Sequence, residues 1–270
     1  MTELSKAFSG LAASGRKGFI PYITAGGPDL ETTYEVMVAL AEAGATVIEL
    51  GVPFSDPMAD GPVIQAACER ALQVGTTLAK VLEVARRAWE KTHVPIVLFS
   101  YLNPLLQYGL EKLARDAKAS GIAGVLVTDL PAESAQQFSA LLRAQQIDLV
   151  MLIAPTTSDA RLQKIAQHAT GFLYTISVAG VTGARKQLSS DVRDLVARIR
   201  RVSQLPVAVG FGISTPEQAR EAWQFADAVV VGSAIVRIIE AEGARAPQRV
   251  REFAQSFTRS TAAVVGKEKA

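Results

Sequence analysis

The stretch Thr46-Val47-Ile48-Glu49-Leu50 has the pattern of a buried β-strand with one acidic residue inside it. Side chains alternate along a strand, so Val47 and Glu49 share one face, while Thr46, Ile48 and Leu50 share the other. When helices flank both faces, an unpaired carboxylate there costs several kcal/mol or takes up a proton. A protein accepts that cost most readily where the carboxyl group performs chemistry, so the pattern makes Glu49 a candidate catalytic residue. The alternative is a structural acid that pairs with a lysine or arginine.

Short apolar runs like this one alternate with longer amphipathic segments along the whole chain. Strands that alternate with helices imply right-handed βαβ units and parallel pairing. Eight such units over about 250 residues predict an α/β fold, a single-domain (β/α)8 TIM barrel. The competing doubly wound open sheet is disfavoured, because no Gly-x-Gly-x-x-Gly motif follows the first strand. The expected strands are Phe19–Thr24, Thr46–Leu50, Pro95–Tyr101, Gly124–Thr128, Leu149–Ala154, Phe172–Ser177, Val207–Gly210 and Ala228–Val231, and the helices between them are Leu30–Ala43, Leu78–Lys91, Gly109–Ser120, Ala132–Gln145, Ala160–His168, Ser190–Val202 and Pro216–Phe225.

Three additions to the eight units are expected. They are an N-terminal helix at about residues 2–14, a segment after the second strand that is long enough for two helices, and a closing helix near 247–260. No linker or low-complexity stretch divides the chain, so residues 1–265 are expected to form one domain. Residues 266–270 are expected to be a disordered tail.

Composition excludes several classes of function. The chain has 270 residues, of which 49% are hydrophobic and 20% charged, which suits a substantial core. A net charge of +2 provides no basic patch for nucleic acid. No apolar stretch approaches the ~18 residues of a membrane span, and the acidic N-terminus does not resemble a signal peptide. The lone Cys68 fits a small buried thiol in a reducing compartment, so a cytoplasmic protein is expected.

A second acid, Asp60, follows Glu49 on the Gly- and Pro-rich loop at 51–62. In such barrels the chemistry lies at the C-terminal ends of the strands, where both acids are expected. Apolar walls should raise the pKa of Glu49 towards neutrality, whereas Asp60 should stay ionised on a more solvated loop. The alternative for Asp60 is a turn residue that caps the backbone. His93 and His168 have no partner at metal-ligand spacing, so no metal is expected.

Glycines at the ends of two late strands indicate a phosphate site. The segments 209–214 and 231–234 expose backbone N–H groups, and a short helix that starts at Ser233 would point its positive end at an anion. Loops after strands seven and eight form the recurrent phosphate site of these barrels. The alternative is that the glycines only make tight turns. The loop at 177–185 fits either a mobile lid or an ordinary exposed connection.

Large side chains near the strand ends fit the wall of a flat apolar pocket, although the same set also fits a plain core. They are Tyr22, Phe99, Tyr101, Leu126, Leu152 and Tyr174.

The segment from Glu49 to Pro62 resembles the signature of the tryptophan synthase alpha subunit family, and the resemblance extends over essentially the whole chain. The segments Gly180–Gly183, Gly210–Ser214 and Gly232–Val236 agree with that family in order and spacing. The resemblance implies retro-aldol cleavage of indole-3-glycerol phosphate to indole and glyceraldehyde 3-phosphate. It implies no metal and no organic cofactor in this chain.

The resemblance also assigns roles to residues. Asp60 would bind the indole N–H and stabilise positive charge on the ring, and Glu49 would move a proton between the leaving carbon and the glycerol hydroxyl. Thr182 would approach Asp60 on lid closure. By the resemblance, Gly183, Gly212, Gly232 and Ser233 would contact phosphate, with Tyr174 beside them. Together with the pocket candidates near the strand ends, the expected substrate-binding set is Tyr22, Phe99, Tyr101, Tyr174, Thr182, Gly183, Phe211, Gly212, Gly232 and Ser233.

A beta subunit that carries pyridoxal phosphate would receive the indole through a tunnel in an α2β2 assembly. Pro53, Asp56, Pro57 and Asn103 would face that partner. Valine at 178 and tyrosine at 22 stand where many relatives carry arginine and phenylalanine. The rival readings are a stand-alone lyase that releases free indole, another phosphate-binding barrel such as a sugar-phosphate isomerase, and a non-catalytic activator of a beta subunit.

Overall fold

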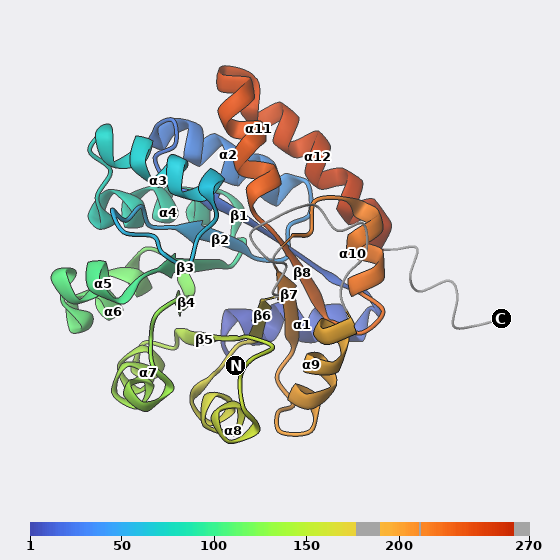
Figure 1. Cartoon of the computed structure of the whole chain (residues 1–270). Helices are drawn as coiled ribbons and strands as arrows, with labels where there is room; N and C mark the ends of the chain where they lie inside the picture. The colour runs from blue at the N-terminus through green and yellow to red at the C-terminus, as the bar shows by residue number, and fades with distance from the viewer. Residues whose placement is uncertain (177–189, 211, 262–270) are drawn as a thin grey trace.

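The computed structural model describes residues 1–176, 190–210 and 212–261. Eight parallel strands pair in sequence order and close into a barrel, with β1 beside β8 (Figure 1). The predicted (β/α)8 architecture is therefore confirmed. The strands are β1 Gly18–Thr24, β2 Ile48–Gly51, β3 Ile96–Ser100, β4 Ile122–Val127, β5 Asp148–Ile153, β6 Leu173–Ile176, β7 Val207–Gly210 and β8 Ala228–Val231.

Helices surround the barrel (Figure 1). The two helices expected after the second strand are α3 and α4, and the expected N-terminal and closing helices are α1 and α12. The α-helices are α1 Glu3–Ala13, α2 Leu30–Glu42, α3 Pro62–Gln73, α4 Leu78–Thr92, α5 Leu102–Tyr108, α6 Leu110–Ala119, α7 Ala135–Ala144, α8 Asp159–His168, α9 Ser190–Arg200, α10 Pro216–Ala222, α11 Ser233–Glu242 and α12 Ala246–Thr261, with short 3₁₀ helices η1 Ala132–Ser134 and η2 Gly243–Arg245. In the described part of the chain, no helix combines the length and the apolar character that a membrane crossing needs.

The alternation of side chains along the strands separates an inner and an outer core. On β2, Ile48 and Leu50 belong to the large cluster between the barrel and its helices. Val47, just before β2, belongs to the smaller cluster inside the barrel, together with Tyr22 and Tyr174. Glu49 therefore points into the barrel, as the alternation predicts.

The helix α1 closes the N-terminal end of the barrel. Its side chains Leu4 and Phe8 are buried in the inner cluster. A Cβ atom added at Gly124 or Gly171 would lie within 3 Å of Leu4 Cδ1, so the helix packs directly on the strand starts. The opposite end is where the strands finish and the candidate site lies.

Local signals account for most helix starts. Asp29 accepts a hydrogen bond from the backbone N–H of Thr32 at 2.7 Å and caps α2. Thr215 and Gln218 form a capping box at the start of α10. Asp and Thr are residue types that commonly cap the first turn of a helix.

Two segments differ from the sequence-based expectation. The helix α5 was not expected, because its first turn is held by tertiary contact: the backbone N–H of Leu102 donates to the Asp129 carboxylate at 2.7 Å. The single helix expected at 132–145 is divided into η1 and α7.

Candidate active site

Glu49 lies on β2 and is fully buried. Among the described residues, neither carboxyl oxygen has a hydrogen-bond partner. Burial alone raises the pKa of this carboxyl to about 8, which agrees with the expected shift towards neutrality. In the described part of the chain, no lysine or arginine pairs with Glu49, so the alternative of a structural acid is not supported. At neutral pH the group is mostly protonated and can exchange its proton.

Asp60 lies on the loop between β2 and α3 and is half-buried. The Tyr101 hydroxyl donates a 2.9 Å hydrogen bond to Asp60 Oδ2 and accepts one from the backbone N–H of Ala59 at 2.9 Å. Burial raises the pKa of Asp60 to about 6, and the hydrogen bond from Tyr101 opposes the rise. Asp60 is therefore mainly ionised at pH 7, although its surroundings are drier than expected.

The two acids face the same interior space. Burial raises the pKa values of the Tyr22 and Tyr174 hydroxyls, and the charges of both Glu49 and Asp60 raise them further. Since Tyr22 comes from β1 and Tyr174 from β6, the acids and both tyrosines converge at the C-terminal end of the barrel.

Two glycines make room for these tyrosines. A Cβ atom at Gly51 would lie 2.3 Å from Tyr22 Oη, and one at Gly210 would lie 2.1 Å from Tyr174 Oη. Each tyrosine therefore leans across the glycine of the next strand. The Tyr22 hydroxyl also lies 3.3 Å from Thr24 Oγ1.

A helix N-terminus adjoins this space. Gly232 precedes α11 and provides no side-chain cap, and Ser233 is the first residue of the helix. A Cβ atom at Gly232 would lie 3.4 Å from the Tyr22 ring, so the start of α11 borders the pocket. Gly212 adopts a φ of +82° in open space. A helix start without a side-chain cap suits an anion such as phosphate.

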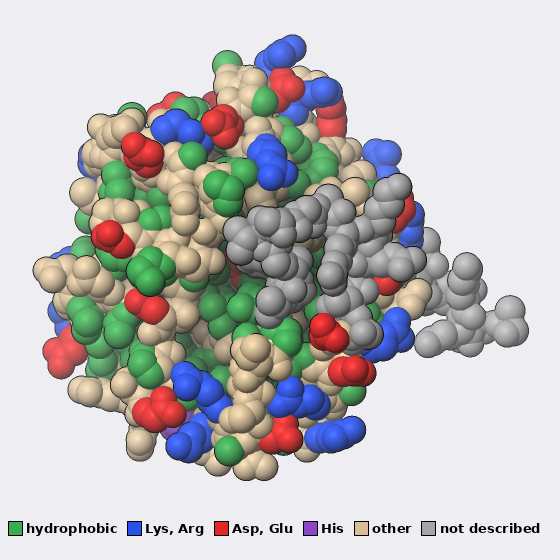
Figure 2. Space-filling model, in the orientation of Figure 1, with side chains coloured by type: hydrophobic (Ala, Val, Ile, Leu, Met, Phe, Trp, Pro, Cys, Tyr) green, Lys and Arg blue, Asp and Glu red, His purple; other side chains and the backbone are tan. Residues whose placement is uncertain are grey.

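A cavity of about 280 Å³ is lined by Ala59, next to Asp60 in the chain, and by residues at the ends of β4 and β5. In the orientation of Figure 1, hydrophobic side chains gather near the middle of the molecular face (Figure 2). Phe99 packs edge-on against Tyr22 with ring centroids 5.1 Å apart. Leu152 lines the cavity, as do Thr128 and Ile176, which were not expected there. These two residues carry no distinctive motif, so only their position reveals them.

Tyr101 has a role that its sequence position does not disclose. It was expected as a pocket wall, but its hydroxyl holds Asp60, while its ring packs against Phe54 with centroids 5.2 Å apart. Cys68 is buried on α3, and burial raises its pKa to about 11. A thiol with that pKa is a poor nucleophile, in agreement with its interpretation as a buried core residue.

The residues expected to face a partner divide into two groups. Asp56 and Asn103 are exposed and Pro57 is half-buried, whereas Pro53 is buried, which argues against a direct contact through its side chain. Thr182, Gly183, Phe211 and Val178, as well as the tail at 266–270, lie outside the described residues. Within the described ranges, no group of three or more His, Cys, Asp or Glu side chains could hold a metal ion.

Comparison with known proteins gives one answer. The sequence profile described as Tryptophan synthase alpha chain matches residues 8–265. A tryptophan synthase alpha chain of Geobacter sulfurreducens is 50% identical over 240 residues, which cover 89% of this chain and 91% of that protein. The crystal structure of tryptophan synthase subunit alpha from Legionella pneumophila superposes with a TM-score of 0.90 at 39% identity, covering 97% of this chain and 99% of that one. A chain of the tryptophan synthase complex from Pyrococcus furiosus gives a TM-score of 0.83 at 38% identity, covering 90% and 98%. The chain therefore belongs to the tryptophan synthase alpha chain family.

Proposed function

We propose that Glu49 and Asp60 are the acid–base pair that cleaves indole-3-glycerol phosphate to indole and glyceraldehyde 3-phosphate. As a member of its family the chain is a lyase of tryptophan biosynthesis, and the alpha chain works with a beta subunit in a complex. The family therefore favours the subunit over the stand-alone lyase. The observation that carries the residue assignment is the convergence of an unpaired, buried Glu49 and a hydrogen-bonded Asp60 on one apolar space.

The different pKa values of the two acids suit different roles. Glu49, mostly protonated at pH 7, donates its proton to the indole carbon that carries the glycerol chain. Asp60, mostly ionised, accepts a hydrogen bond from the indole N–H and stabilises the positive charge that protonation places on the ring.

The second half of the reaction restores the proton to Glu49. Its carboxylate removes the proton of the hydroxyl next to the ring as the carbon–carbon bond breaks. The electrons of that bond return to the indole, and the hydroxyl carbon becomes the aldehyde of glyceraldehyde 3-phosphate. Each turnover thus leaves the protonation state of Glu49 unchanged.

The remaining predicted contacts supply binding and orientation. The start of α11 at Ser233, together with Gly232 and Gly212, would hold the phosphate, and Gly183 would add to it. Tyr22, Phe99, Tyr174 and Leu152 would enclose the indole ring, with Phe211 and Thr182 completing the pocket. The support is the position of the described members around one space.

The exposed Asp56 and Asn103 and the half-buried Pro57 would face the beta subunit, with Pro53 beneath them. Pyridoxal phosphate belongs to that subunit, and we propose that this chain works without a cofactor. We also propose that residues 1–265 form one domain and that the protein is cytoplasmic. The unpaired Cys68 supports that location.

The assay that tests the proposal follows indole release from indole-3-glycerol phosphate by the full chain, alone and with a beta subunit. We expect indole from the chain alone and at least ~10-fold faster turnover with the partner. A chain that forms no indole under either condition would disprove the proposed reaction.

A further inference from the structure

The loop between β5 and α8, at residues 154–158, forms one wall of the cavity that Ala59 also lines. Ala154 and Thr157 face this cavity, together with Leu152 of β5, which the proposed function places at the indole ring. A ring in the cavity packs against the loop, and close packing tolerates little displacement. The contacts that hold the loop therefore bear on substrate binding.

The barrel sheet supports only the start of this wall. In the residues that the structure describes, β4 pairs with β5 as far as Val150, and β6 pairs with β5 as far as Ile153. Beyond that point the backbone N–H of Ala154 donates to Thr157 Oγ1 at 3.1 Å, and the N–H of Thr157 donates to the Ala154 carbonyl at 2.9 Å. These two bonds close a tight turn. Both lie inside the loop, so they do not attach it to a neighbouring element.

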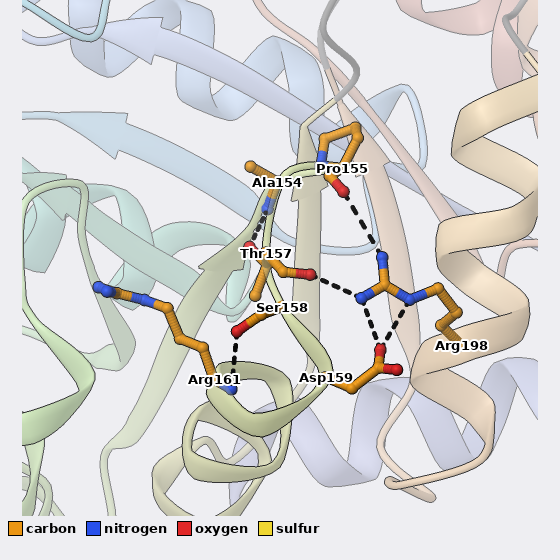
Figure 3. A network of polar contacts seen from close by, with 7 residues as sticks. All are labelled: Ala154, Pro155, Thr157, Ser158, Asp159, Arg161 and Arg198. Carbon is orange, nitrogen blue, oxygen red and sulfur yellow. Dashed lines mark hydrogen bonds and ion pairs between the residues drawn. The ribbon is translucent and has the colours of Figure 1, made fainter.

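Arg198 attaches the loop to the helix α9 (Figure 3). Its Nη2 donates to the Thr157 carbonyl at 2.6 Å, and its Nη1 makes a longer contact of 3.5 Å with the Pro155 carbonyl. Its Nε and Nη2 contact Oδ1 of Asp159, the first residue of α8, at 2.9 and 2.6 Å. One planar guanidinium thus binds two carbonyls of the loop and the start of the next helix, which restricts both the distance and the tilt of the wall.

The ion pair itself is the lesser part of this arrangement. The Asp159 side chain is 80% exposed, and an ion pair with such a partner contributes little to stability. The Arg198 side chain is 30% exposed, and its contacts with the two loop carbonyls are partly buried. Loss of Arg198 should therefore change the position of the loop more than the stability of the fold.

We propose that Arg198 is a positioning residue for substrate binding, which holds Ala154 and Thr157 where the cavity admits the aromatic ring. The inference rests on the proposed function, because that function puts an indole ring in this cavity. Arg198 does not line the cavity, so it acts through the loop and not on the ring itself. The proposed phosphate contacts at the start of α11 follow β8 and are independent of this loop.

The test compares the wild-type chain with Arg198→Gln in calorimetric titrations with indole and, separately, with inorganic phosphate. Glutamine keeps a polar side chain and removes the fork of donors. We expect the Kd for indole to rise about tenfold and the Kd for phosphate to stay within about twofold. In the lyase assay the KM should rise by a similar factor while kcat stays within about twofold, because Glu49 and Asp60 belong to β2 and the loop after it.

Amide hydrogen exchange reports the wall without any ligand. The amide of Ala154, whose hydrogen bond to Thr157 Oγ1 closes the turn, should exchange about tenfold faster in Arg198→Gln. Exchange at the wild-type rate would show that Arg198 does not hold the loop and would overturn the proposal.

Arg200→Gln is the matched control. Arg200 lies on the same helix and pairs at 2.6 Å with Asp227, which precedes β8 at the other end of the barrel. Its loss removes an ion pair and leaves the wall intact, so the Kd for indole should stay within about twofold. Asp159→Asn removes the charge and keeps Oδ1 as an acceptor for Arg198, so it should also stay within about twofold.

Two results of the titrations would overturn the positioning role. One is a Kd for indole in Arg198→Gln that equals the wild-type value, and the other is an equal rise in Arg200→Gln or Asp159→Asn. Binding of indole requires no turnover. A tenfold rise of this Kd in a chain without lyase activity would contradict the proposed reaction and support the role of Arg198, whereas equal Kd values in an active chain would contradict the role of Arg198 alone.

Discussion

Glu49 and Asp148 are buried carboxyl groups at opposite ends of the same barrel. Glu49 stands near the C-terminal end of β2, and Asp148 begins β5 at the end that α1 covers. Glu49 is 0% exposed and Asp148 is 3% exposed. Burial raises the pKa of both carboxyl groups. Burial therefore does not distinguish a reactive acid from a structural one.

Their partners do distinguish them. The Thr2 and Thr170 side chains lie close enough to the Asp148 carboxyl group to oppose the rise in its pKa, so that only Oδ2 of Asp148 is left without a hydrogen-bond partner among the described residues, whereas both oxygens of Glu49 are. Thr170 also accepts a hydrogen bond from the backbone N–H of Leu149 at 2.8 Å, which joins Asp148 to the closed end of the barrel. Glu49 has no such partner in the part of the chain that the structure describes. The comparison teaches that the acid left without partners, at the end that is open to ligands, is the one available for proton transfer.

The largest effect is expected at the unpartnered acid. Glu49→Gln keeps the shape of the side chain and removes its titratable proton, so turnover of indole-3-glycerol phosphate should fall at least ~100-fold. Substrate binding should persist, because the proposed phosphate contacts lie elsewhere. The measurement is single-turnover indole formation with separate determination of the substrate Kd. Turnover within tenfold of the wild-type chain would remove Glu49 from the mechanism.

Asp60→Asn should also reduce turnover at least ~100-fold, because the amide cannot stabilise positive charge on the ring. Its folding should be intact, which far-UV circular dichroism and the free energy of unfolding would show. Normal turnover by this variant would mean that the assigned role of Asp60 is wrong.

A smaller effect is expected at the partner of Asp60. Tyr101→Phe removes a charge-assisted hydrogen bond worth about 1.5 kcal/mol, which corresponds to about a tenfold loss of turnover. Because that bond lowers the pKa of Asp60, the variant should raise the pKa above its present value of about 6. The acid limb of the pH–rate profile should therefore move to higher pH. An unmoved limb would show that this limb does not report Asp60.

The smallest effect is expected at the closed end. Asp148→Asn can retain hydrogen bonds with Thr2 and Thr170, so the free energy of unfolding at pH 7 should change by no more than about 1 kcal/mol. The kcat should stay within about twofold of the wild-type value, because Asp148 lies at the other end of the barrel. A kcat loss as large as that of Glu49→Gln would end the contrast between the two acids.

Much of this arrangement could be predicted from the sequence. The alternation at Thr46–Leu50 placed Glu49 inside the barrel, because strand periodicity is a local property. Gly210 ends β7 and Gly232 follows β8, as the glycine-containing segments at 209–214 and 231–234 indicated. The start of α10 is also set locally, because its capping box joins Thr215 to Gln218 in the same turn of the chain.

What the sequence did not reveal depends on contacts between distant segments. The helix α5 is stabilised at its start by Asp129, which lies 27 positions away. Tyr101 was expected to line the pocket, but its hydroxyl binds Asp60, 41 positions away. The end of the pairing between β4 and β5 at Leu126 and Val150 follows from their register and has no sequence signal of its own. Tertiary geometry decides all three features.

Titration of the Glu49 carboxyl group tests the central claim most directly. The pKa of Glu49 is about 8 in the folded chain, against 4.5 for a freely solvated glutamate. Below pH 4.5 the group is protonated in both the folded and the unfolded chain, so it adds no pH dependence there. Between pH 4.5 and pH 8 it lowers the free energy of unfolding by about 1.4 kcal/mol per pH unit, and above pH 8 the loss is complete.

The experiment records infrared difference spectra of the wild-type chain and the Glu49→Gln variant from pH 4 to pH 10, following the carbonyl stretch of the neutral acid. The structure predicts a single protonated carboxyl that is present in the wild-type chain, absent from the variant, and lost with a midpoint near pH 8. A Glu49 carboxyl that ionises near pH 4.5 would contradict it, since a group that is already charged at neutral pH cannot donate the proton that the cleavage requires.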